Sequence, residues 1–95
     1  VMFSASCSVS AASNNQVLSF KGWHYDTSGS SGALIDESLV SRKVTASGEL
    51  GAVVVQGSAL LSVNDYLEIH VTNETSTAAV TVADFNFQAT ALPTV

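Results

Sequence analysis

Asp65 and Glu68 form one candidate carboxylate pair in this 95-residue sequence. Two carboxylates at close range can share the roles of general acid and general base. On a strand, however, residues three positions apart point to opposite faces of the sheet. Asp65 also follows Asn64, a combination typical of a turn. We therefore interpret Asp65 as a turn-capping residue and not as half of a catalytic pair.

Serine, histidine and aspartate, the residue types of a nucleophilic triad, are all present. Serine accounts for 15 of the 95 residues, so such combinations with His24 or His70 arise by chance, and the nucleophile-elbow sequence Gly-x-Ser-x-Gly does not occur. His24 is expected to be a partly exposed residue at a strand end. His70 is expected to be a solvated or interface residue that can hydrogen-bond Glu68. With no catalytic motif, we expect that the protein is not an enzyme and binds no cofactor. The two histidines lie far apart in sequence, so we also expect no bound metal.

The segments that must position these side chains have the period of β-strands. Residues 3–11 alternate strictly between apolar residues and serine, which is the pattern of a half-buried strand. Cys7 falls on the apolar side, so we expect a buried, unpaired thiol. Further strands are expected over residues 16–25, 39–46, 50–56, 66–72 and 79–92, separated by turns rich in Gly, Asn, Asp and Ser.

Three of these segments, and the loop that follows residues 16–25, carry more specific expectations. The run Val53-Val54-Val55 indicates a strand that is buried on both faces or lies in an interface. The apolar phase changes at Ala83-Asp84, which predicts a β-bulge or a strand break. Residues 26–32 are expected to form a long flexible loop. In segment 66–72 one face carries Leu67, Ile69 and Val71, and the other carries Tyr66, Glu68 and His70.

No helical stripe runs for three turns, and turns recur roughly every 8–12 residues. The sequence therefore predicts an all-β fold: a single small antiparallel β-sandwich, jelly-roll-like, with about seven or eight short strands over residues 1–95. A domain this small buries only about 60–65% of its unfolded surface and is marginally stable alone. The single cysteine excludes an intramolecular disulfide, so oligomerisation is the expected remedy.

Charge restricts the partners. Charged residues make up 12% of the chain, the formal net charge is −5, and the basic residues are Lys21, Arg42 and Lys43. Binding to nucleic acid requires clustered Lys and Arg, and so does adsorption to anionic membranes. No apolar run approaches the roughly 20 residues of a transmembrane helix. The opening residues lack the positive and continuous apolar regions of a signal peptide. We expect neither a nucleic-acid partner nor a membrane.

From Val40 onward, three stretches, residues 40–43, 59–71 and 73–82, form a pattern together with the aromatic run Phe85-Asn86-Phe87. Residues 64–68 read Asn-Asp-Tyr-Leu-Glu, and Tyr25-Asp26-Thr27 follows an earlier strand. Together they resemble small jelly-roll modules of tailed-phage virions, which are similar in fold to the trimeric C1q/tumour-necrosis-factor-like domains. The Asn-Asp-Tyr-hydrophobic-Glu signature of that superfamily leads the strand nearest the three-fold axis.

The resemblance implies a structural virion protein, a homotrimer that decorates (cements) the capsid surface and contacts the major capsid protein or another virion protein. It places Tyr66, Glu68 and His70 at or near the three-fold axis. An alternative is a carbohydrate- or receptor-binding knob of a fibre, or a secreted C1q-like binding module. For that alternative, Trp23 and Tyr25 beside the 26–32 loop are the candidate ligand platform.

Overall fold

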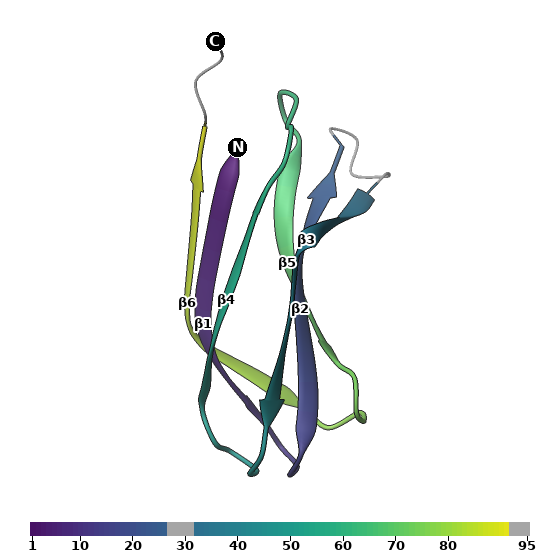
Figure 1. Cartoon of the computed structure of the whole chain (residues 1–95), viewed down its shortest axis with the longest axis vertical. Coiled ribbons are helices and arrows are strands. Elements are labelled where there is room, and N and C mark those ends of the chain that lie inside the picture. The colour runs from purple at the N-terminus through teal and green to yellow at the C-terminus, as the bar shows by residue number, and fades with distance from the viewer. Residues whose placement is uncertain (27–31, 92–95) are drawn as a thin grey trace.

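The structure is a computed structural model that describes residues 1–26 and 32–91. Within these ranges the chain forms six strands and no helix (Figure 1). The strands are β1 (Met2–Ala11), β2 (Gln16–Tyr25), β3 (Gly32–Val44), β4 (Gly51–Ser58), β5 (Tyr66–Asn73) and β6 (Val80–Thr90). Across the described ranges, no helix is long and apolar enough to cross a membrane.

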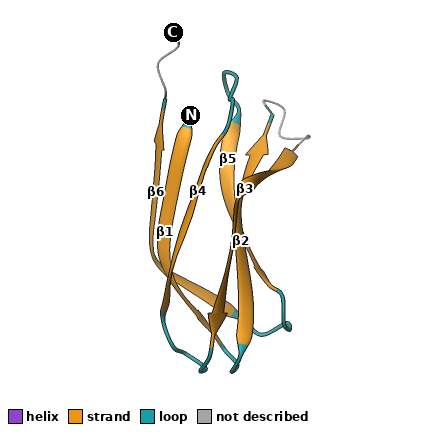
Figure 2. Ribbon diagram, viewed as in Figure 1, coloured by secondary structure: helices purple, strands orange, loops and turns teal. Residues whose placement is uncertain are grey.

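The strands pair into two three-stranded sheets, one with the order β4-β1-β6 and the other with the order β3-β2-β5 (Figure 2). Every pairing is antiparallel. The alternation of β1 places Phe3 and Val9 in the core between the sheets, and β2 contributes Leu18 and Phe20 from the other side. The predicted all-β sandwich is therefore confirmed.

The number of strands differs from the expected seven or eight. Residues 59–61 continue as loop after β4, and residues 80–90 remain a single strand across their irregularity. Residues 32–38, which carry no clear alternation, join residues 39–44 of the strand expected at 39–46 to form the 13-residue β3. The loop expected at 26–32 lies mostly in residues 27–31, outside the described part of the chain, and Gly32 already belongs to β3.

β4 corrects the expectation of a strand buried on both faces. Val53 and Val55 are buried, but Val54 between them is 51% exposed. The reason is that β4 belongs to one of only two packed sheets, so one of its faces meets the other sheet and the opposite face meets solvent. An interface on the outer face of β4 stays a prediction.

The β-bulge predicted at Ala83-Asp84 is confirmed. The register between β1 and β6 shifts between Ser6 and Ser8, and Asp84 has a φ of 51°. The shift keeps side chains of both apolar phases on the face of β6 that looks toward the core, because Val82 pairs with buried Val9 and Phe87 pairs with buried Ala5.

A second irregularity lies in β3. Phe20 pairs with Val40 and Gly22 pairs with Ile35, so residues 36–39 have no partners on β2. The buried Ser38 hydroxyl accepts a hydrogen bond from Gly22 N (2.7 Å) and donates one to the Ile35 carbonyl. These two bonds supply backbone partners that the interrupted ladder leaves open.

Candidate functional site

An aromatic face lies on the outer side of the β3-β2-β5 sheet. Its members are Trp23 and Tyr25 of β2 and Tyr66, Glu68 and His70 of β5. Tyr25 lies directly across from Tyr66 and Trp23 from Glu68, so the two groups share one face. From the sequence, the three β5 residues were expected at a trimer axis and the two β2 residues in a ligand platform. Strand pairing brings both groups onto one surface.

Ring stacking holds the aromatic face together. Tyr25 and Tyr66 stack with centroids 5.4 Å apart and planes 18° apart, and Trp23 and His70 stack at 5.2 Å and 10°. His70 Nε2 lies 3.0 Å from Glu68 Oε2, as expected for residues two apart on a strand. Cross-strand aromatic pairs add about 0.5–1.5 kcal/mol each beyond the area they bury. Each of the four rings therefore has one face covered by a neighbour within the same chain.

Gly32 of β3 lies close against the Trp23 and Tyr25 side chains at the edge of this face. A Cβ at Gly32 would collide with Trp23 Nε1 and lie 2.9 Å from Tyr25 Cε1, so only glycine allows β3 to pass this close. Trp23 Nε1 is buried and makes no hydrogen bond among the described residues.

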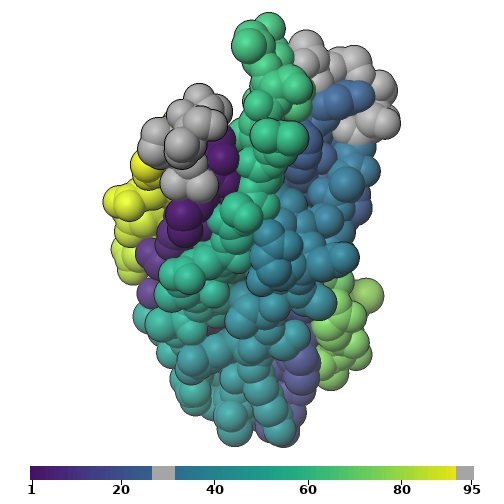
Figure 3. Space-filling model, turned by 45° about the horizontal axis from the view of Figure 1, so that its top comes forward, coloured from purple at the N-terminus to yellow at the C-terminus, as the bar shows by residue number. Residues whose placement is uncertain are grey.

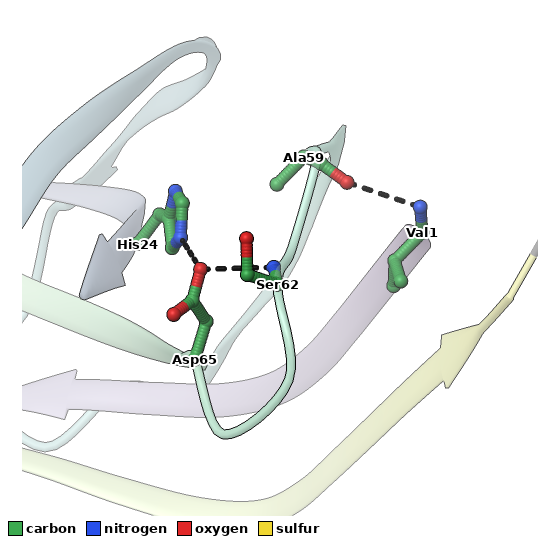
Figure 4. Close-up of polar contacts among 5 residues, drawn as sticks. All are labelled: Val1, His24, Ala59, Ser62 and Asp65. Carbon is green, nitrogen blue, oxygen red and sulfur yellow. Dashed lines mark hydrogen bonds and ion pairs between the residues drawn. The ribbon is translucent and has the colours of Figure 1, made fainter. Parts of the chain in front are cut away.

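His24 points away from the aromatic face and meets Asp65 in the turn that leads into β5 (Figure 4). His24 Nε2 lies 3.0 Å from Asp65 Oδ2, which also accepts a hydrogen bond from Ser62 N at 2.9 Å. Asp65 N in turn donates to the Ser62 carbonyl at 3.1 Å, and Asn64 takes a φ of 69°. The turn-capping interpretation of Asp65 is confirmed.

The contact with His24 was missed by sequence reasoning. Its two residues are 41 positions apart, and no motif links them. The Asp65 side chain is only 8% exposed, so its carboxylate depends on these protein partners. Ser62 takes part through its backbone N–H, so the arrangement positions a turn and is not a nucleophilic triad.

The loop between β4 and β5 ends in an apolar tip, which we define as residues 60–63. Leu60 is 94% exposed and Val63 is 83% exposed. Both ends of the loop are fixed: Ala59 exchanges two backbone hydrogen bonds with Val1 at 2.9 and 3.0 Å, and Asp65 is held by His24. The loop projects beyond the strands in Figure 1 and forms the green protrusion of Figure 3.

A second exposed apolar surface lies on β6, and we call Val82, Phe85 and Phe87 the exposed strip. Their positions on β6 face the interior of the sandwich, yet Phe85 is 50% exposed and Phe87 is 37% exposed. β3 and β4, one edge strand of each sheet, contact each other along one side of the sandwich, whereas β5 and β6, the other two edge strands, make no comparable contact among the described residues (Figure 1). One side of the core is therefore left partly uncovered.

Cys7 is buried and free, as predicted. Burial raises the pKa of its thiol by desolvation, which disfavours the reactive thiolate. Within the described residues, no group of three or more His, Cys, Asp or Glu side chains could hold a metal ion. An open hollow of about 680 Å³ lies beside the start of β1, and among the described residues that line it Glu37 is the ionisable one.

Comparison of the chain with known proteins finds no matching family model, no matching curated protein and no matching solved structure.

Proposed function

We propose that this chain is a self-associating structural protein, a homotrimer in which a neighbouring copy covers the open side of the sandwich. The observation that carries this proposal is the exposed strip: two phenylalanines directed toward the core lie about half in solvent. Burying one such side chain contributes about 1.5–3 kcal/mol. A small domain without disulfides gains the stability that it lacks from a symmetric interface.

More specifically, we propose that the chain is a decoration protein on the surface of a phage capsid. There it would contact other copies of itself and the major capsid protein or another virion protein. This assignment is supported by the resemblance of residues 59–71 and 73–82 to phage jelly-roll modules. The sparse charge and the Ser- and Thr-rich surface suit a protein that only covers and cements.

The aromatic face is a second surface that this trimer can use, with Tyr66, Glu68 and His70 at or near its axis. Tyr66 is exposed, and aromatic residues are enriched in interface cores. Glu68 and His70 already pair within one chain, so neither needs a neighbouring copy for its partner.

Light scattering coupled to gel filtration tests the proposal. We expect the unmodified protein to elute as a trimer and the double variant Phe85→Ser/Phe87→Ser to elute as a monomer. Leu50→Ser is the control, because Leu50 is an exposed apolar side chain in a loop outside the exposed strip. A protein that is monomeric at all accessible concentrations would contradict the proposal.

A carbohydrate- or receptor-binding module, such as a fibre knob or a secreted C1q-like domain, is the second candidate. Aromatic side chains beside the carboxylate of Glu68 on one exposed face favour it. Stacking between the rings counts against it, because a sugar packs against free ring faces. A glycan array on the unmodified protein, repeated with Trp23→Ala, separates the two candidates: a glycan bound only when Trp23 is present would establish binding.

A further inference from the structure

We propose that copies of this protein join head to tail, with the apolar tip of one copy docked on the exposed strip of the next. This inference rests on the proposed self-association and names the two surfaces that meet. The tip is residues 60–63, and the strip is Val82, Phe85 and Phe87.

The apolar side chains of the tip are largely exposed to solvent. Leu60 and Val63 are 94% and 83% exposed, so neither packs against the core, although both are among the large apolar residues of the protein. The loop that carries them is held by Val1 at its start and by the His24–Asp65 contact at its end. A loop fixed in this way loses little conformational freedom when it docks.

The strip offers the complementary surface. Phe87 stacks on buried Phe3 with centroids 6.2 Å apart, and Phe85 lies next to it at 6.4 Å, so the rings are anchored on one side and open on the other. In the described part of the chain, β1 is the only strand that pairs with β6, so the second edge of β6 has no partner strand there. Two leucine- or valine-sized side chains are the kind of group that such a surface buries.

At these two surfaces, charge does not oppose another copy as the partner. Each chain carries a formal net charge of −5, so a contact between copies must keep carboxylates apart. Residues 60–64 contain no ionisable side chain, and the carboxylate that follows, Asp65, is paired with His24. Along the strip the only ionisable residue is Asp84. Tip and strip are thus two apolar surfaces that two copies can bring together without like-charge repulsion between them.

The contact joins two different surfaces, so it is heterologous. Contacts of this type close into rings when the rotation between copies allows it. A ring of three copies buries every tip and every strip, which agrees with the proposed trimer.

Mixing two variants tests the inference. The tip variant is Leu60→Ser/Val63→Ser, and the strip variant is Phe85→Ser/Phe87→Ser; Leu50→Ser, an exposed loop leucine, is the control for the tip. We expect each variant alone to be monomeric and Leu50→Ser to assemble like the unmodified protein. The equimolar mixture retains one intact tip and one intact strip, so it should form a heterodimer of twice the monomer mass.

The outcomes separate the inference from the proposed function. A tip variant that still forms the full oligomer would overturn the inference and leave self-association standing. A mixture that stays monomeric at the highest attainable concentration, with both variants folded by circular dichroism, would also overturn it. An unmodified protein that is monomeric would instead refute the proposed function itself.

Discussion

His24 Nε2 lies 3.0 Å from Asp65 Oδ2 and joins the end of β2 to the turn before β5. The same carboxylate oxygen caps Ser62 N at 2.9 Å, so one buried side chain fixes both the turn and its position on the sheet. The tip depends on this contact for its direction. Changes at His24 and Asp65 therefore report on how the tip is held.

Asp65→Ala should lower the free energy of unfolding by about 1–3 kcal/mol, because it leaves His24 and Ser62 N without their shared acceptor. Asp65→Asn keeps an oxygen acceptor and should lose less. Chemical denaturation of both variants gives the comparison. Equal losses for Ala and Asn would show that the carboxylate charge, and not the hydrogen bonds, holds the turn.

Cys7→Ser should lower the free energy of unfolding by about 1–3 kcal/mol, because it places a hydroxyl in the apolar core. Burial raises the thiol pKa above its unfolded value, so the folded state retains the proton. The contribution of the protonated thiol to the free energy of unfolding is fully present below the thiol pKa of the unfolded chain. It is lost as the pH rises from that value through the raised pKa of the folded state.

Thiol labelling provides an independent measurement on Cys7. The native protein should react with a bulky thiol reagent far more slowly than the denatured protein does, because the side chain is buried. Rapid labelling of the native state at neutral pH would contradict the assignment of Cys7 to the core.

Tyr66→Ala should weaken the trimer by about 2 kcal/mol or more per subunit when Tyr66 is an interface anchor. It also removes the stack with Tyr25, so the melting temperature of a monomeric form must be measured as well. Thr72→Ala, a change on the same outward face of β5, serves as the control. A trimer that is indifferent to changes at both Tyr66 and His70 would remove the aromatic face from the interface.

Gly22→Ala should destabilise the fold by about 1–3 kcal/mol through overpacking. An added Cβ would lie 2.6 Å from the Phe3 ring and 3.2 Å from Ser38 Oγ, the hydroxyl that accepts the hydrogen bond of Gly22 N. Thermal unfolding measures the loss, with Ser41→Ala as an exposed control on β3. An unchanged melting temperature would mean that the sheets separate easily at this point.

Local alternation along the chain was enough to predict which side chains face the core on β1, β5 and β6. Side-chain direction alternates along any strand, so neighbouring residues in the chain are enough to predict which side chains are buried. This applies to the burial of Cys7, the outward position of Tyr66 and the bulge at Asp84. The two-layer, all-β architecture follows from the same local pattern.

Tertiary structure alone decided which strands became neighbours. Pairing of β2 with β5 placed Trp23 beside His70 and Tyr25 beside Tyr66, and it brought His24 to Asp65 across 41 residues. Likewise, Val54 is exposed because no third layer covers β4, which its apolar neighbours could not reveal. The physical reason is that alternation fixes the faces of a strand but not its partner, since the backbone hydrogen bonds that join strands are the same for every pairing.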